Sequence, residues 1–172
     1  MAKRSFVLFS ILIFVTSFVL AEEKPMPGKI KVYNAFTKAY EEVDLILKDE
    51  KAWEQKLTPE QICITSQKGT ESPFTGVYWN SKEKGIYVCV RCGNHLFDSQ
   101  TKFESGTGWP SFWQPVAKEN VKLIPDNSHS MHRIEVVCAR CGAHLGHLFD
   151  DGPPPTQKRF CMNSAALELK KN

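Results

Sequence analysis

The chain has no strong imbalance of charge. Of its 172 residues, 22 are Lys or Arg and 19 are Asp or Glu, and two of the basic residues fall within the first 21 positions. A protein that binds nucleic acid normally carries a marked basic excess to neutralise phosphates, so we expect no nucleic-acid partner. The sequence also has no Asn-x-Ser/Thr acceptor site for N-glycosylation. Its length supports one domain with one active site, and we expect a monomer.

The N-terminus carries a run of sixteen uncharged residues, Ser5 to Leu20, preceded by Lys3 and Arg4. This pattern is typical of a secretory signal, and we predict that residues 1–21 are a signal peptide cleaved after Ala21. The run is slightly short for a bilayer span, so an uncleaved membrane anchor stays open as the alternative. Because no cysteine follows the cleavage site, a bacterial lipoprotein is disfavoured. We therefore expect a secreted or periplasmic protein that contacts a membrane only if this segment is retained.

Residues 22–52 are predicted to form an N-terminal extension. Pro25 and Pro27 mark a short linker, and the residues after them alternate enough to suggest a small hairpin followed by a helix. Thr58 and Pro59 then predict the start of a second helix, because a threonine hydroxyl can accept an orphan amide and proline is tolerated in the first turn. Gly69 is predicted to end that helix.

From Gly76 onwards the sequence lacks any long helical periodicity. Short apolar runs such as GIYVCV and HRIEVVCA alternate with Gly, Pro, Asn and Asp, which predicts a mainly β domain of antiparallel strands. The run DDGPPP, at 150–155, cannot lie inside a sheet because its prolines have no amide to donate. We expect a rigid surface loop there.

Four of the six cysteines form two copies of Cys-x-x-Cys-Gly, at Cys89/Cys92 and Cys138/Cys141, with 45 residues between the pairs. Two such knuckles can direct four thiolates to one point, which is the arrangement of a structural Zn²⁺ site. A redox-active pair and structural disulfides are the alternatives. Duplication of the motif argues against the first, and the strain of such short disulfide loops argues against the second.

Cys63 and Cys161 remain outside this set. Cys161 lies two residues after Arg159, whose positive charge would favour the thiolate, so we interpret Cys161 as a nucleophile. A buried, inert cysteine is the alternative.

A histidine-rich segment precedes Cys161. His144 and His147 lie three residues apart, with carboxylates just beyond at Asp150 and Asp151. Imidazole can transfer a proton near neutral pH and a carboxylate can fix its tautomer, so these residues are interpreted as an acid–base group. A second metal site is the alternative.

With these residues in view, the chain from about Trp53 to Leu169 resembles the methionine-R-sulfoxide reductases of the B type. The resemblance is carried by LTPEQ, GTESPFTG, KGIYVCVRCG, FESGTGWPSFW, CARCGAHLGHLFDDGPPPT and RFCMNSAAL. It implies a domain over 53–169 with a short tail at 170–172. The implied fold is a β-tent of two antiparallel sheets, with short N-terminal helices and a zinc site made by two knuckles.

The resemblance also implies roles for individual residues. Cys161 would attack the sulfur of the sulfoxide, releasing methionine and becoming a sulfenic acid. His147, assisted by His144 and Asp151, would protonate the sulfoxide oxygen, and Asn163 would orient this group or a bound water.

The same resemblance points to an apolar site for the substrate methyl group. Trp109 would hold this methyl, with Phe112 as a further wall. A core aromatic is the alternative interpretation of Trp109.

Two departures from common family patterns concern how Cys161 is reduced again. Thr107 and Thr75 stand where different members carry a recycling cysteine, which leaves Cys63 as the expected resolving thiol. If Cys63 is inert, an external dithiol would reduce the sulfenic acid directly.

The resemblance implies oxidised proteins as substrates and a thioredoxin-like reductant as partner. Two other functions remain open from the residues alone. A zinc-knuckle binding module would need the four zinc cysteines but no thiol beside histidines, and a disulfide-exchange enzyme would use Cys63 with Cys161.

Overall fold

The computed structural model describes residues 28–46 and 50–171. The predicted signal peptide therefore lies outside the described residues. Within the described ranges, no helix has the length and apolar character needed to cross a bilayer. The chain is mainly β, and its strands pair antiparallel in each sheet, as the sequence predicts.

An N-terminal hairpin and two helices precede the domain core. The hairpin pairs β1 (Lys29–Asn34) with β2 (Ala39–Asp44), and α1 (Glu50–Glu54) and α2 (Pro59–Gln67) follow. Thr58 caps α2 as predicted, since its hydroxyl accepts the amide of Gln61, whose side chain accepts the Thr58 amide in return. The helix ends at Gln67, and its C-cap Lys68, the residue just before the predicted Gly69, adopts the left-handed conformation.

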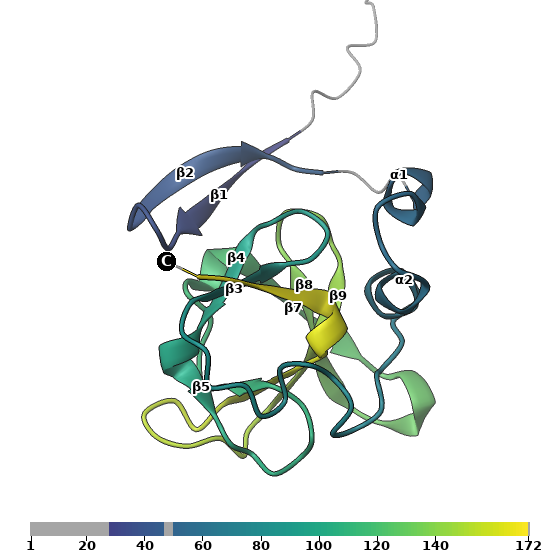
Figure 1. Ribbon diagram of the computed structural model, residues 1–172, viewed down its shortest axis with the longest axis vertical. Helices are drawn as coiled ribbons and strands as arrows, with labels where there is room; N and C mark the ends of the chain where they lie inside the picture. The colour runs from purple at the N-terminus through teal and green to yellow at the C-terminus, as the bar shows by residue number, and fades with distance from the viewer. Residues whose placement is uncertain (1–27, 47–49, 172) are drawn as a thin grey trace, which may run out of the picture.

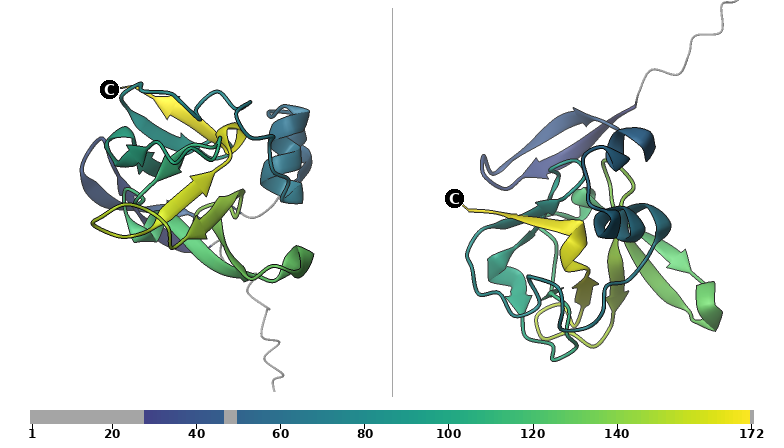
Figure 2. Two further views of the ribbon diagram at one scale, coloured as in Figure 1. Left: turned by 90° about the horizontal axis from the view of Figure 1, so that it is seen from below. Right: turned by 45° about the vertical axis from the view of Figure 1, so that its right-hand side comes forward.

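The domain core consists of two antiparallel sheets (Figure 1). The smaller sheet has the order β11 (Leu167–Lys170), β3 (Ile86–Cys89), β4 (His95–Asp98). The larger has the order β5 (Lys102–Phe103), β6 (Ser111–Phe112), β10 (Arg159–Met162), β9 (His144–Phe149), β8 (Arg133–Cys138), β7 (Val121–Asp126). Short 3₁₀ turns join them: η1 (Ser99–Thr101), η2 (Lys118–Asn120), η3 (Ser128–Ser130) and η4 (Ser164–Ala166). The end of β7 and the start of β8 project beyond the rest of the sheet (Figure 2).

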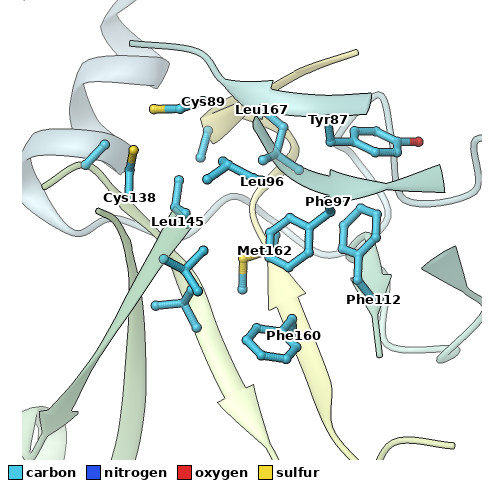
Figure 3. Close-up of a cluster of buried hydrophobic side chains, with 14 of the residues drawn as sticks. Tyr87, Cys89, Leu96, Phe97, Phe112, Cys138, Leu145, Phe160, Met162 and Leu167 are labelled. Carbon is cyan, nitrogen blue, oxygen red and sulfur yellow. The ribbon is translucent and has the colours of Figure 1, made fainter. Parts of the chain in front are cut away.

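The hydrophobic core lies between the two sheets. Phe97 of β4 stacks on Phe112 of β6, with ring centroids 4.5 Å apart, and Phe160 of β10 lies against Phe97 (Figure 3). Leu145 and Met162 are completely buried in the same cluster. Each such side chain contributes roughly 1.5–3 kcal/mol through removal of apolar surface from water. The core therefore fixes β9 and β10 side by side.

A β-bulge interrupts β9 where it pairs with β8. Val136 lies opposite Gly146 and Val137 opposite His144, so Leu145 is the extra residue. Residues three apart on a regular strand face opposite sides of the sheet, whereas the bulge re-aims the strand. As a result His144 and His147 lie on the same side, with ring centroids 5.4 Å apart.

Gly146 allows β10 to approach this bulge closely. A Cβ atom at position 146 would lie 2.1 Å from the carbonyl oxygen of Cys161 and 2.9 Å from Cα of Met162. No side chain fits there without moving β10. We expect Gly146→Ala to lower the free energy of unfolding by about 2 kcal/mol or more, measured by urea denaturation.

Gly28→Ala is the matched control, because a Cβ atom at Gly28 would meet nothing within 4 Å. Its effect should stay within about 0.5 kcal/mol. Equal stability of the two variants would contradict the close packing of β10 on Gly146.

Candidate active site and metal centre

Cys161 lies in a row of residues that crosses the larger sheet. The register places Cys161 opposite His147 of β9 on one side and Ser111 of β6 on the other, and His147 opposite Glu135 of β8. Directly opposite residues project to the same face of a sheet, so the sheet itself brings these four side chains together. The sequence-predicted residues Cys161 and His147 are thus neighbours in space.

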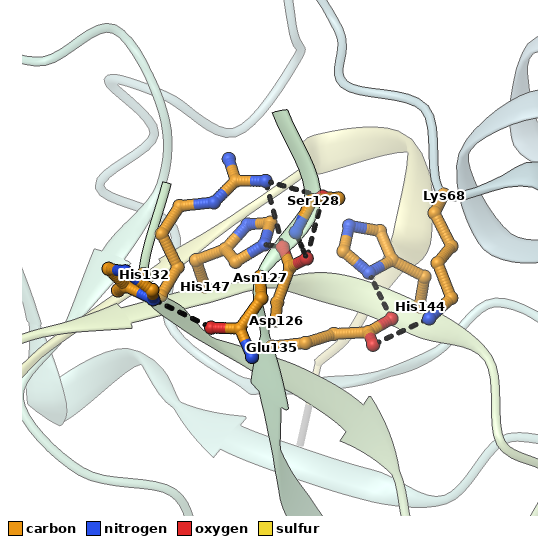
Figure 4. A network of polar contacts seen from close by, with 9 residues as sticks. Lys68, Asp126, Asn127, Ser128, His132, Glu135, His144 and His147 are labelled. Atoms are coloured by element: carbon orange, nitrogen blue, oxygen red, sulfur yellow. Dashed lines mark hydrogen bonds and ion pairs between the residues drawn. The ribbon is translucent and has the colours of Figure 1, made fainter. Parts of the chain in front are cut away.

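His144 and His147 are each paired with a carboxylate from β7 or β8 (Figure 4). His147 Nε2 lies 2.8 Å from Oδ2 of Asp126, and His144 Nδ1 lies 2.8 Å from Oε1 of Glu135. Arg133 also bonds Asp126, at 2.8 Å, and Lys68, at the end of α2, bonds Glu135 at 2.8 Å. Both imidazoles are therefore held by a carboxylate that is itself paired with a cation.

These contacts determine which forms of the side chains are favoured. Hydrogen bonds from Ser128, followed by that from His147, hold the pKa of Asp126 well below its usual range. Burial raises the pKa of Glu135, but hydrogen bonds from Lys68 and His144 outweigh it, so the net pKa is lowered. Burial lowers the pKa of His144 and outweighs the opposing effect of Glu135. Near neutral pH both carboxylates are ionised and His144 is neutral.

A small cavity of about 150 Å³ opens onto Cys161 and His147. It is also lined by Thr70, Trp109, Arg133, Gly146, Phe149, Met162 and Asn163. A cavity of this volume accommodates a group about the size of benzene, which is the scale of one side-chain end. Trp109 lies at the wall of the cavity beside the thiol, the place that the family resemblance implies for it.

Phe112 does not line this cavity. Its side chain is fully buried and stacks on Phe97, so the expectation that it forms a wall of the substrate site is wrong. Neighbouring residues of a strand face opposite sides: Ser111 faces Cys161, and Phe112 therefore faces the core. Phe149 supplies the aromatic wall instead.

Asn163 holds the loop that carries the wall of the cavity. Its Oδ1 accepts the amide of Glu71 at 3.1 Å, and its Nδ2 donates to the carbonyl of Leu145 at 3.1 Å. The carbonyl of Glu71 accepts the indole N–H of Trp109 at 3.1 Å. Asn163 therefore connects the loop at 69–76, the indole and the bulged strand.

Asp151 contacts Arg159 in place of a histidine. Its two oxygens accept hydrogen bonds from Nε and Nη2 of Arg159 at 2.8 and 2.9 Å, and Arg159 lies over the ring of Phe149. Asp126 occupies the place beside His147 that the sequence reasoning gave to Asp151. Asp151 thus orients the arginine next to Cys161.

Burial dominates the electrostatics of Cys161. It raises the pKa of the thiol, while the charge of Arg159 and hydrogen bonds from Thr107, Ser111 and Arg159 lower it without outweighing burial. The sequence reasoning anticipated a thiolate favoured by Arg159, whereas the resting group is a neutral thiol at neutral pH. Thr107 is thus one of the groups whose hydrogen bonding favours the thiolate of Cys161.

Cys63 is exposed on α2, and it is not among the residues that line the cavity at Cys161. A Cβ atom at Gly69 would lie 2.8 Å from its Sγ. The next residue, Thr70, does line the cavity. The residue beside Cys63 and the residue in the cavity wall are thus adjacent in the chain.

The four knuckle cysteines converge away from the cavity. Their sulfur atoms all lie within 4.8 Å of one another, with Cys89 to Cys141 at 3.7 Å and Cys92 to Cys138 at 3.6 Å. A disulfide needs about 2.05 Å, whereas four sulfurs at 2.3 Å from a tetrahedral Zn²⁺ lie about 3.8 Å apart. The cluster is therefore arranged to hold a metal ion with four thiolate ligands.

The sequence reasoning missed Asp126 and Glu135. Glu135 had one signal, since a single carboxylate inside the apolar run of β8 calls for a buried cation or donor. Asp126 had none, because it ends an exposed strand and its contact with His147 depends on how β7, β8 and β9 are paired.

The thiol chemistry can be tested through alkylation of Cys161. Because alkylation needs the thiolate and burial raises this pKa, the rate with iodoacetamide should still rise as the pH passes the ordinary thiol range. Arg159→Met should shift the curve to higher pH by removing a nearby positive charge. The measurement is mass spectrometry of the peptide containing Cys161.

Lys158→Met is the matched control, because Lys158 pairs with the exposed Asp150. It should leave the alkylation curve unchanged. A curve that reaches its plateau below neutral pH would contradict the dominance of burial.

Comparison with known proteins assigns the family. Residues 57–171 match the SelR domain. The chain is 57% identical to the peptide methionine sulfoxide reductase MsrB of Methanosarcina barkeri over 123 residues, 72% of this chain and 87% of the relative. It is 64% identical to the chloroplastic peptide methionine sulfoxide reductase B1 of Arabidopsis thaliana over 121 residues, 70% and 59% of the two chains. The chain therefore belongs to the SelR-domain family of B-type peptide methionine sulfoxide reductases and is an oxidoreductase.

Proposed function

We propose that the protein reduces the R epimer of methionine sulfoxide in oxidised proteins, with Cys161 as the attacking group. The observation that carries this proposal is the pairing of Cys161 with His147 in one side-chain-sized cavity beside Trp109. A binding module has no use for a thiol and a carboxylate-paired imidazole facing one small cavity. The names of the relatives support the same reaction.

The reaction balances with the thiol alone as reductant. The sulfur of Cys161 bonds to the sulfoxide sulfur, and the substrate sulfur–oxygen bond breaks as the protonated oxygen leaves as water. Water then bonds to the Cys161 sulfur, the sulfur–sulfur bond breaks with methionine as the leaving group, and Cys161 is left as a sulfenic acid. The thiol sulfur loses two electrons and the sulfoxide gains them. The proton of the neutral thiol ends on the sulfenic oxygen, so a thiol with a raised pKa requires no net proton from solvent.

The histidines supply the proton that the sulfoxide oxygen needs while the bond breaks. His147 is the proposed acid, because it lines the cavity and its ring is held by Asp126, which fixes its tautomer. His144 is neutral and is held by Glu135. Its ring packs against that of His147 and keeps His147 in place. Arg159, oriented by Asp151, stabilises negative charge on Cys161 as its proton leaves.

The substrate site is apolar on the side where a methyl group would lie. The indole of Trp109, fixed by its bond to Glu71, and the ring of Phe149 provide this wall. Asn163 bonds the loop at 69–76 and so holds the indole in position.

Cys63 is the proposed resolving thiol. It attacks the sulfenic acid on Cys161, a Cys63–Cys161 disulfide forms and water leaves. Its contact with Gly69 supports this route, because Thr70 follows in the cavity wall and movement of this loop would bring α2 toward the site. An external dithiol of the thioredoxin type would then reduce the disulfide.

The metal ion is proposed to be a structural Zn²⁺, held by Cys89, Cys92, Cys138 and Cys141. The ion would link the loops after β3 and β8 and so stabilise both sheets. Without a cation, hydrogen bonding with Cys138 and Cys141 keeps the pKa of Cys92 far above its usual range. The positive charge of a divalent ion would favour the thiolate of Cys92 and so lower that pKa.

We also propose that the enzyme is exported and acts as a monomer on envelope or secreted proteins. The composition of residues 1–21 supports export, through a positive start, an apolar run and a small residue at position 21.

The activity is tested with the separate R and S epimers of a dabsylated methionine sulfoxide and dithiothreitol. We expect consumption of the R form alone, and no turnover after Cys161→Ser. Consumption of the S form alone would contradict the proposal, and thiol loss without formation of methionine would favour disulfide exchange.

The role of the carboxylate is tested by Asp126→Asn. Loss of the charge beside His147 should lower kcat at pH 7 toward the effect of His147→Ala, for which we expect about 10²–10⁴-fold. Asp150→Asn is the control, because Asp150 is exposed and pairs with Lys158. An Asp126→Asn variant as active as the control would show that the pairing has no part in the reaction.

The metal is tested by chelation. We expect one Zn²⁺ per chain, and removal of the ion should lower the melting temperature or unfold the domain. Cys89→Ser should lose the metal and stability before it affects the chemistry at Cys161. A metal-free protein with an unchanged melting temperature would contradict a structural ion.

A further inference from the structure

The N-terminal hairpin lies outside the range that matches the SelR domain, yet it is docked on the metal centre. It crosses the end of the molecule above the strands that lead into the knuckles (Figure 1). An isolated two-stranded hairpin is marginally stable in water, so its order depends on what it contacts.

Asn120 forms the main link between the hairpin and the metal centre. Its completely buried side chain accepts the amide of Tyr33 at 2.8 Å and donates to the carbonyl of Tyr33 at 2.8 Å. It also donates to the carbonyl of His95, in β4 just after the first knuckle, at 2.7 Å. The Asn120 side chain thus makes the two backbone hydrogen bonds to Tyr33 of β1 that a neighbouring strand would otherwise make.

From Asn120 the contacts continue to a metal ligand. The carbonyl of Asn120 accepts Nδ2 of Asn94 at 2.9 Å, and the same nitrogen lies 3.5 Å from Sγ of Cys138. The amide of Ala139 donates to that carbonyl as well, at 3.1 Å. The position of the Cys138 sulfur is therefore connected through Asn94 and Asn120 to the backbone of β1.

Residues 44–46, at the end of the hairpin, contact the second knuckle, which in turn bonds the first. Ile46 donates its amide to the carbonyl of Arg140, between the ligands of the second knuckle, at 2.9 Å, and Arg140 Nε donates to the carbonyl of Asp44 at 3.3 Å. Arg140 also donates to the carbonyl of Cys92 in the first knuckle, at 3.3 Å. On the other side Ala35 donates its amide to His95 Nδ1 at 2.9 Å.

We infer that residues 28–46 act as a clamp on the metal centre, with Asn120 and Asn94 as positioning residues for its ligands. The inference rests on the proposed metal occupancy of the four cysteines. Partners that orient metal ligands typically change metal affinity by 10- to 100-fold when they are lost. A docked hairpin slows loss of the ion, because the knuckles must separate from it before the ligands can move apart.

The test is the rate at which full-length, Zn²⁺-loaded protein transfers its metal to a chromogenic chelator. Val32→Asp places a charge at the buried position of β1 and should speed release by about 10- to 100-fold. Ala39→Asp introduces the same charge at an exposed position of the same hairpin and should leave the rate unchanged.

A third variant is designed to stabilise the hairpin. Lys38 has a left-handed backbone with φ of 56°, so Lys38→Gly removes strain and should slow release on the order of fivefold. This variant decides the question even if Val32→Asp does not fold.

The possible outcomes separate this inference from the proposed function. Purified protein without Zn²⁺ would contradict the metal proposal itself. Bound Zn²⁺ that leaves at the same rate in the wild type and Lys38→Gly, or in Val32→Asp and Ala39→Asp, would overturn the clamp. Release that is faster in Val32→Asp, slower in Lys38→Gly and unchanged in Ala39→Asp would establish it.

Discussion

The candidate active site depends on the antiparallel pairing of β9 with β10. This pairing places His147 opposite Cys161, and it is close only because position 146 carries no side chain. The bulge at Leu145 then turns His144 to the same side as His147. The positions of the thiol, the proposed acid His147 and the imidazole of His144 are thus set by backbone geometry, which the packed core behind β9 and β10 holds in place.

A balance between burial and charge sets the state of Cys161. Burial keeps the resting thiol neutral although Arg159 is close to it, and Asp151 shares the charge of that arginine. A neutral thiol reacts slowly with stray oxidants, whereas the oxygen of a bound sulfoxide takes up a proton as the sulfur–oxygen bond breaks. In the proposed mechanism, reactivity is greatest when a sulfoxide fills the cavity and His147 can donate a proton to its oxygen.

The sequence predicts those features that arise from neighbouring residues. The cap of α2, the strands at GIYVCV and HRIEVVCA and the convergence of the two knuckles follow from local patterns, and the structure has all of them. Which histidine each carboxylate meets could not be predicted, because Asp126 and Glu135 reach the imidazoles across strands whose register includes a bulge.

Two predictions, for Phe112 and Asp151, were wrong because of the local path of the chain. Phe112 follows Ser111 on one strand, so it faces the core and leaves the cavity to Phe149. Asp151 is close to His147 in sequence, but the carboxylate meets Arg159, eight residues later, where the loop returns to β10. Closeness along the chain was a poor guide at both positions.

The central claim is that the substrate oxidises one sulfur atom, that of Cys161. The most direct measurement is mass spectrometry of the enzyme after a single turnover with a peptide containing methionine-R-sulfoxide, in the absence of any reductant. The account predicts one methionine formed per chain, with Cys161 recovered as a trapped sulfenic acid or joined to Cys63. Methionine formed while Cys161 remains a free, alkylatable thiol, and Cys63 unchanged, would contradict it.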